Sequence, residues 1–185
     1  IDNFRYDQWK VVQQQLNELF NVVSDEMYMT ILPTTTHYAR NSFFAGMLPS
    51  EIEKLYPNLW VNEEDEEGKN IHEEDLLGRQ LQRAGIKDKF SYTKITNLNA
   101  GKALVDQVPN MWSNPLNVVV YNFVDMLSHA RTEMNVMKEL AEDEAAYRSI
   151  TASWFEHSPL FEAIKKMASK KSRIIITTDH GSIRV

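Results

Sequence analysis

The sequence contains no cysteine, which excludes both a disulfide framework and a thiolate metal site. Any metal ion must therefore be bound by carboxylate, imidazole or hydroxyl groups. The sequence also lacks a signal peptide at its start and any apolar run long enough to cross a bilayer, so we expect a cytoplasmic protein without membrane contact. The formal net charge of −6 disfavours broad contact with a nucleic-acid backbone, but it is compatible with a small phosphate ester held by a metal.

The remaining composition is that of an ordinary soluble globular protein. Of the 185 residues, 43% are hydrophobic and 25% are charged, so the chain can bury the core of one domain. The chain opens on Ile1-Asp2, which reads as the last step of a strand, and it stops just after Asp179-His180-Gly181. We therefore expect one domain over residues 1–185 that is truncated at both ends.

Strand-like runs alternate with helical patterns along the chain. Apolar runs predict strands at 27–32, 116–124 and 173–178, the last two buried on both faces, and a weaker signal predicts one at 90–95. Helical spacing predicts helices at 7–20, 37–47, 50–56, 73–84, 100–105 and 144–168, the last broken near Ser158-Pro159. The alternation predicts an α/β fold, a three-layer sandwich with a mostly parallel central sheet and helices on both faces.

The segment at 55–115 is polar, aromatic and irregular, and we expect it to be an insertion over the edge of the sheet. Five adjacent carboxylates at 63–67, followed by Gly68, predict a solvated acidic loop within it, because like charges repel and no calcium-loop pattern follows. The segment has no recognisable specificity motif, so it does not identify a substrate.

An acidic residue and a histidine follow one of the predicted strands. Asp125 comes directly after the run at 116–124, and His129 lies four residues further on, about one helical turn away. In open α/β sheets, ligands bind at the carboxyl ends of the strands, where these two side chains could share an ion. Taken alone the pattern is weak, because a helix-capping Asp and a surface His would also produce it.

Two further carboxylates occupy similar places. Asp179 and His180 follow the run at 173–178, and Asp2 follows Ile1. Parallel strands bring their carboxyl ends to one edge of a sheet, where crowded carboxylates would repel one another unless a cation lay between them. Oxygen and imidazole ligands suit Zn²⁺, with Mn²⁺ as the alternative. Together these residues predict a metal site.

A candidate nucleophile lies in the segment Leu32-Pro33-Thr34-Thr35-Thr36, which leads into the helix predicted to begin near His37. The N-terminus of a helix offers backbone N–H groups and a positive dipole end to a phosphate. A threonine hydroxyl is a poor nucleophile by itself, but metal coordination lowers its pKa. The alternative is a structural N-cap, a role in which threonine is common.

With these residues the sequence resembles the PglZ family of the alkaline phosphatase superfamily, and in particular the PglZ domains at the C-terminus of PorX-type response regulators. The resemblance covers four motifs in the family's order across the chain. They are Ile1 to Trp9 for the first metal Asp; Leu32 to Thr36 with Arg40-Asn41-Ser42 and Ala45 to Pro49 for the nucleophile; and Asp125-x-x-x-His129 and Thr178-Asp179-His180-Gly181 for the later metal ligands.

The nucleophile segment also resembles that of the nucleotide pyrophosphatase/phosphodiesterases, which read P-T-x-T with a G-x-x-P ten residues after the second Thr. Here the spacing from Thr36 to Gly46 and Pro49 matches. This resemblance selects Thr36 over Thr34 and Thr35 as the nucleophile.

The family resemblance implies two groups of zinc ligands. They are Asp2, Thr36, Asp179 and His180 for one ion, and Asp125 and His129 for the other. The superfamily supplies a further His to the second ion well downstream, and no His follows His180 here. Either that residue lies beyond Val185 or the second site is defective. The other histidines, His37, His72 and His157, are expected to be surface or structural residues. His37 is close enough to Thr36 to touch a substrate.

The function implied is that of a two-zinc phosphoryl hydrolase, the output domain of a bacterial two-component response regulator. Its substrate would be a phosphodiester such as a nucleotide or short oligonucleotide, with Arg40 and Asn41 as phosphate ligands, unless Arg40 is a solvated helix residue. One alternative is a catalytically weak zinc-binding signalling and interaction module of the type IX secretion system. Another is a structural α/β domain without metal. The partners expected are the other domains of the regulator, and the sequence leaves a homodimer open.

Overall fold

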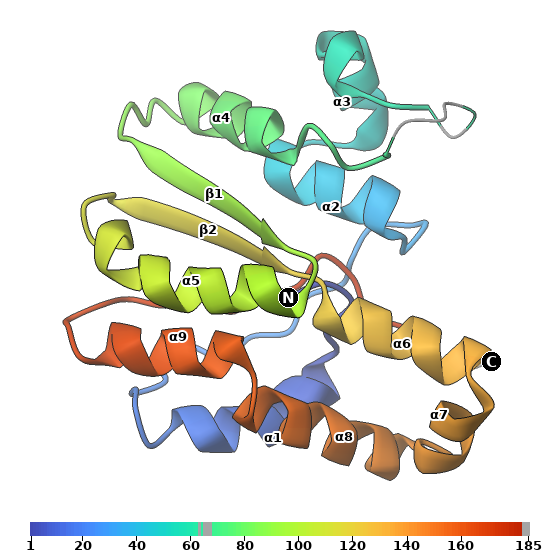
Figure 1. The fold of residues 1–185 in the computed structure, drawn as a ribbon. Helices are drawn as coiled ribbons and strands as arrows, with labels where there is room; N and C mark the ends of the chain where they lie inside the picture. Colours follow the sequence, from blue (N-terminus) through green and yellow to red (C-terminus); the bar gives the residue numbers. More distant parts are fainter. Residues whose placement is uncertain (63, 65–67, 183–185) are drawn as a thin grey trace.

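Two parallel strands, β1 (Phe90–Ile95) and β2 (Leu116–Tyr121), form the sheet in the computed structural model, which describes residues 1–62, 64 and 68–182 (Figure 1). The strands pair in register from Phe90 opposite Leu116 to Ile95 opposite Tyr121. Helix α5 (Leu98–Met111) connects them, because parallel neighbours need a crossover connection. The pleat then sends alternate β2 side chains to opposite faces: Val120 packs into one core and Tyr121 into the other.

Helices cover both faces of this sheet, as Figure 1 shows. On the Val120 face lie α2 (Thr36–Ala45), α3 (Pro49–Leu55), the short 3₁₀ helix η1 (Pro57–Leu59) and α4 (Glu73–Arg83). On the Tyr121 face lie α5, α1 (Tyr6–Leu16), α8 (Glu144–Glu156) and α9 (Pro159–Ala168). Beyond the carboxyl end of β2, α6 (Phe123–Glu133) and α7 (Asn135–Leu140) pack against α8. The three layers confirm the predicted α/β architecture.

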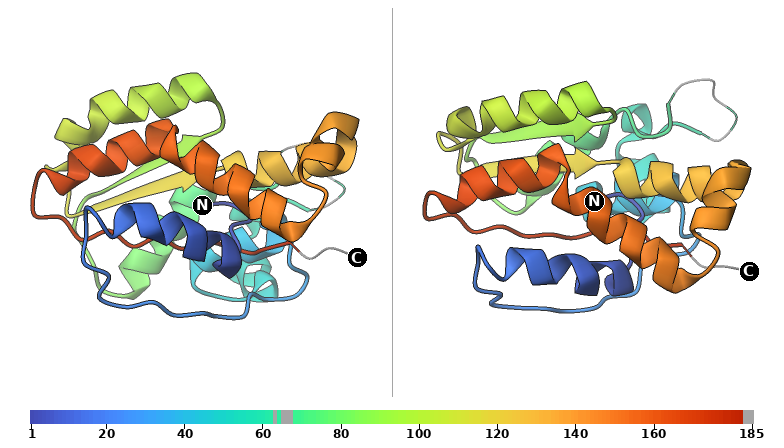
Figure 2. Two further views of the ribbon diagram at one scale, coloured as in Figure 1. Left: turned by 90° about the horizontal axis from the view of Figure 1, so that it is seen from below. Right: turned by 60° about the horizontal axis from the view of Figure 1, so that its bottom comes forward.

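Two of the predicted strands are wrong as strands. The segment at 27–32 runs extended along the outside of the molecule, where Figure 2 shows it as part of a long strap between α1 and α2. Its Met29 side chain is 92% exposed. Side-chain bonds hold it in place, from the Tyr28 hydroxyl to the Thr178 carbonyl and from Thr30 Oγ1 to the Asp179 carbonyl at 2.8 Å. The apolar composition therefore indicated an extended conformation correctly, but the segment does not form the backbone hydrogen bonds of a strand.

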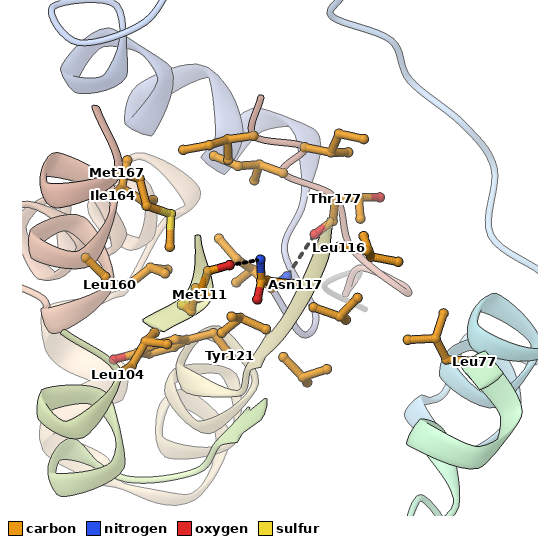
Figure 3. A pocket seen from close by; sticks show the side chains of 18 of the residues that line it. Leu77, Leu104, Met111, Leu116, Asn117, Tyr121, Leu160, Ile164, Met167 and Thr177 are labelled. Carbon is orange, nitrogen blue, oxygen red and sulfur yellow. Dashed lines mark hydrogen bonds between the residues drawn. The ribbon is translucent and has the colours of Figure 1, made fainter. Parts of the chain in front are cut away.

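The segment at 173–178 is also extended without forming a strand. A cavity of about 550 Å³ separates it from β2, so its backbone has no ladder partner on that side. Side chains of α5, α9 and β2 point into this cavity, among them Leu104, Ile164 and Tyr121 (Figure 3). The walls are mainly apolar, with a few polar side chains such as Asn117 and Ser172, and one end of the cavity reaches Asp2 and Asp179.

The third predicted run, 116–124, ends as a strand at Tyr121, and α6 begins at Phe123. Its last apolar residue, Val124, is fully buried, so burial continues while the backbone changes from strand to helix. Asp125 therefore lies in the first turn of α6 rather than directly at a strand end. In a short apolar run, the spacing of apolar residues alone cannot distinguish a buried strand from the start of a buried helix.

The helical predictions were more successful. Those at 7–20, 37–47, 50–56, 73–84 and 100–105 correspond to α1, α2, α3, α4 and part of α5, and that at 144–168 is divided into α8 and α9 at Ser158-Pro159. The segment predicted as an insertion contributes α4, β1 and α5 to the two cores. Its acidic loop at 63–68 falls mostly outside the described residues. No described helix is both long and apolar enough to span a membrane.

Candidate metal centre

The first residues of the chain are fixed between β2 and the extended segment at 173–178. The Ile1 amino group donates to the Thr177 carbonyl at 2.8 Å, and the Asp2 N–H donates to the Tyr121 carbonyl at 3.0 Å. Asp2 therefore lies at the carboxyl end of β2, next to Asp179, although the two are separated by almost the whole chain. The sequence predicted this meeting.

Asp2, Asp179 and His180 form the one group of three or more potential metal ligands found in the described part of the chain. One ligand atom from each lies within 4.8 Å of the others, and all three residues are buried. The His180 Nε2 atom is 3.5 Å from Asp2 Oδ1 and 3.9 Å from Asp179 Oδ2. Thr36 Oγ1 lies 2.9 Å from the same nitrogen. Four of the six predicted ligands thus meet at one place.

Each carboxylate uses one oxygen to bind the protein. Asp179 Oδ1 accepts the backbone N–H groups of Asn3 and His180, at 3.3 and 3.0 Å, and Asp2 Oδ2 accepts Arg40 Nη1 at 2.8 Å. The other oxygens, Asp2 Oδ1 and Asp179 Oδ2, are buried without a hydrogen bond. Buried polar atoms without a partner are costly and rare. Two such oxygens beside an imidazole nitrogen and a hydroxyl fit the ligand set of a Zn²⁺ ion.

The charges of this group are strongly coupled. Burial alone would raise the pKa of Asp2, but His180 and Arg40 hold it below its ordinary value. Burial and the charge of Asp2 raise the pKa of Asp179. Burial would lower the pKa of His180, but its contact with Asp2 and the charge of Asp179 outweigh burial and raise it. Without metal, Asp179 and His180 therefore retain their protons to a higher pH than usual, and a bound cation would displace those protons.

Thr36 is the first residue of α2, and Thr35 occupies the N-cap position. The backbone N–H groups of this first turn and the positive end of the helix dipole lie beside its hydroxyl, as expected for a site that receives a phosphate. The Thr35 side chain makes no capping hydrogen bond. The prediction that a threonine of this segment stands at a helix N-terminus is confirmed.

Asp125 and His129 lie together but outside the group of four. His129 Nε2 is 3.6 Å from Asp125 Oδ2, its other ring nitrogen is 3.6 Å from Glu133, and its side chain is 66% exposed. Burial and the charge of Asp2 raise the pKa of Asp125, so its carboxyl lies within electrostatic reach of the group. The structure thus separates the predicted ligands four and two, as the family resemblance implied, and their role as zinc ligands stays a prediction.

Asn3 connects the two groups and was not singled out from the sequence. Its backbone N–H donates to Asp179 Oδ1, and its side-chain amide donates to Asp125 Oδ1 at 3.4 Å. The backbone at Asn3 has φ of 56°, in the left-handed region that Asn tolerates better than most residues. Its position directly after Asp2, the first predicted metal ligand, was the one feature of the sequence that could have pointed to it.

The two predicted phosphate ligands are buried and bind other residues of the protein. Arg40 is 4% exposed and contacts Asp2 and Glu73, so the alternative of a solvated helix residue is wrong. Asn41 is 1% exposed and donates to the Lys69 carbonyl at 3.0 Å. Phosphate binding by either side chain stays a prediction.

The three histidines outside the motifs have structural neighbours or surface positions. His37 stacks on Trp60 with ring centroids 4.8 Å apart, His72 lies 3.7 Å from Asp75, and His157 follows the end of α8. His37 is the residue directly after Thr36 in α2. Its contact with a substrate stays a prediction.

A comparison with protein families gives an independent result. The model of the BREX system PglZ alkaline phosphatase-like domain matches residues 1–185. A search of the curated proteins finds no match to the chain. The family match includes every residue of the candidate metal centre.

Proposed function

Because the chain belongs to the PglZ family of alkaline phosphatase-like domains, we propose that it is a zinc-dependent phosphodiesterase with Thr36 as its nucleophile. Family membership supports a phosphoesterase-type hydrolase. The finer parts of the proposal, which are the metal, the nucleophile and the diester substrate, rest on the geometry of the site and on the spacing of its motifs.

The observation that carries the proposal is the pair of buried carboxylate oxygens that make no hydrogen bond. Asp2 Oδ1 and Asp179 Oδ2 lie close to His180 Nε2, which in turn lies 2.9 Å from Thr36 Oγ1. A bound zinc ion would supply Lewis-acid charge and lower the pKa of a coordinated hydroxyl. Asp2, Asp179, His180 and Thr36 would hold one ion, and Asp125 and His129 would contribute to a second.

The residues of the chain then have distinct parts in phosphoryl transfer. The Thr36 hydroxyl gives up its proton and its oxygen forms a bond to phosphorus, while the bond from phosphorus to one ester oxygen breaks and that departing oxygen takes up a proton. The N–H groups of the first turn of α2 face the charge that develops on the phosphoryl oxygens, and the helix fixes the hydroxyl in its direction of attack. Water then attacks the phosphorus of the threonine-linked ester and displaces the Thr36 oxygen, which takes back a proton, and the rest of the substrate leaves as a phosphomonoester.

The proposed substrate and biological setting follow from the spacing of the motifs and from the family resemblance. The spacing from Thr36 to Gly46 and Pro49 supports a nucleotide-derived diester. The resemblance to PorX-type regulators supports a place as the output domain of a two-component response regulator, next to its other domains.

A second candidate function is a zinc-binding signalling module with little turnover, as in the type IX secretion system. The position of His129 favours this candidate: its side chain is 66% exposed and lies outside the group of four, whereas a two-metal mechanism needs a second ion held beside the first. A module of this kind would keep the buried site and lose the second one.

The test compares Thr36→Val with Thr35→Val in zinc-loaded protein. Thr35 is exposed and makes no capping bond, so its replacement is a matched control for the segment. We expect Thr36→Val to lower the rate of hydrolysis of bis(p-nitrophenyl) phosphate by more than about a thousandfold, since the nucleophile itself is removed. We expect Thr35→Val to change the rate less than about threefold.

The other outcomes separate the candidate functions. Equal activity of wild type and Thr36→Val would exclude Thr36 as nucleophile. Zinc binding by a wild-type protein that hydrolyses neither this diester, nor p-nitrophenyl phosphate, nor a dinucleotide would favour the signalling module. Absence of zinc by elemental analysis after loading would favour a structural domain.

A further inference from the structure

Behind the candidate metal centre lies a buried ion-pair cluster that the proposed mechanism does not use. Its centre is Arg40 of α2, and its far end is Glu73, the first residue of α4. Building on the proposed function, we propose that Glu73 is a positioning residue for the cation site: it holds Arg40, which in turn fixes the Asp2 carboxylate with Oδ1 toward the site.

The guanidinium of Arg40 lies among three carboxylates. Its Nη1 atom is 2.8 Å from Asp2 Oδ2, and its Nε atom is 2.7 Å from Glu73 Oε1 and 3.8 Å from Asp179 Oδ2. All four side chains are 5% exposed or less. The Nε–H makes no hydrogen bond, so the contact with Glu73 is electrostatic. In such a place a small shift of the guanidinium changes which carboxylate it neutralises.

Glu73 is itself held from a different element. The hydroxyl of Tyr92 donates to Oε2, and Lys94 Nζ donates to Oε1 at 3.2 Å, both from β1. Burial and the neighbouring Glu73 raise the pKa of Tyr92, which keeps its hydroxyl protonated as a donor. The carboxylate of Glu73 is therefore anchored to the sheet and draws Arg40 toward it.

This anchoring matters because the two carboxylate oxygens of Asp2 have different roles. Oδ2 accepts the hydrogen bond from Arg40, and Oδ1 lies 3.5 Å from His180 Nε2 without a hydrogen bond. If Glu73 lost its charge, Arg40 would be free to shift toward Asp179 Oδ2 and neutralise an oxygen that the cation needs. Residues that orient the ligands of a metal typically change its affinity by about 10- to 100-fold.

A purely structural role for the pair makes a different prediction. Arg40 and Glu73 also join α2 to α4 and β1, and breaking a buried ion pair destabilises a fold whether or not a metal binds. The two roles separate when zinc affinity and metal-free stability are measured on the same variants.

The experiment uses Glu73→Gln, with Glu74→Gln as the matched control, because Glu74 is the next residue of α4 and is exposed. Zinc affinity is measured by competition with a chromophoric chelator, and the melting temperature is measured with and without zinc. We expect Glu73→Gln to bind zinc about 10- to 100-fold more weakly than wild type and Glu74→Gln to bind it equally well. The zinc-induced rise in melting temperature falls in parallel.

Tyr92→Phe provides a second variant if Glu73→Gln does not fold. It removes one bond to Glu73 and leaves the charge, so we expect a smaller loss of zinc affinity in the same direction. Zinc affinities equal to wild type in the folded variants, with only the metal-free melting temperature lowered, would overturn the proposal and leave a structural ion pair. Absence of zinc binding by wild type would instead overturn the proposed function, and this inference with it.

Discussion

At the scale of single residues, the backbone around the site depends on a few special positions. Gly46 ends α2 with φ of 62°, in the left-handed region, and its N–H donates to the Ser42 carbonyl at 2.8 Å. A β-carbon there would lie 2.6 Å from the Gln80 side-chain amide. Gly85 has a similar φ of 73°, but a β-carbon there would meet nothing within 4 Å.

These two glycines allow strain and crowding to be separated. We expect Gly85→Ala to destabilise the fold by about 1 kcal/mol through the left-handed backbone alone. Gly46→Ala adds the displacement of Gln80 to the same strain, so we expect a loss larger by about 1 kcal/mol. Urea unfolding of both variants measures the difference. Equal losses would mean that Gln80 moves away freely.

The residues of the site were predictable to different degrees. Asp179 and His180 follow a short run rich in β-branched residues, and Thr36 precedes a helical pattern, so each stood out in the sequence. Glu73 did not, because an acidic residue in the first turn of a helix is common for reasons of the helix dipole alone. Only the folded chain brings it to Arg40.

At the scale of elements, α1 and α8 are joined by charged side chains. Asp7 of α1 accepts from Arg5 at 2.7 Å and from Arg148 of α8 at 3.1 Å. Burial alone would raise the pKa of Asp7, but the bonds to Arg5 and Arg148 outweigh burial and lower it. These two ion pairs therefore contribute stability above the usual Asp pKa of about 3.9, and this stability is lost as the pH falls through the lowered pKa.

This gives a pH-dependent prediction for Asp7→Asn. The variant should be less stable than wild type by about 1 kcal/mol at pH 7, the upper end for partly exposed pairs. The difference should persist down to about pH 5 and shrink below the usual Asp pKa of about 3.9, as the pH falls toward and through the lowered pKa of Asp7. Denaturant unfolding across this range measures it, with the exposed Asp106→Asn as control. A difference that stays constant into acid would contradict the assignment to this ion pair.

Elements were predictable where one segment determines its own structure. Helical spacing identified α1 to α4 because a helix forms its hydrogen bonds within one segment. A strand needs a neighbour, which the sequence does not specify. Hence the segments at 27–32 and 173–178 are extended, as their composition indicates, but neither forms a ladder. The end of β2 at Tyr121 was missed because burial continues into α6.

At the scale of the whole molecule, the sheet and its two layers of helices bring together residues from both ends of the chain. Asp2 and Asp179 meet because the first residues are bonded to Tyr121 on one side and to Thr177 on the other. The sequence predicted this through the rule that parallel segments carry their carboxyl ends to one edge. It could not predict which oxygen of each carboxylate stays free, because that depends on Arg40 and on the backbone of Asn3.

The central claim is that a cation occupies the place between these free oxygens. The most direct measurement is anomalous diffraction at the zinc edge from crystals grown with zinc. We predict a peak within about 2.0–2.2 Å of Asp2 Oδ1, Asp179 Oδ2 and His180 Nε2, with Thr36 Oγ1 as the fourth neighbour. A second peak beside Asp125 and His129 would add the other ion of the proposed mechanism. Zinc-saturated crystals without a peak among Asp2, Asp179 and His180 would contradict the account.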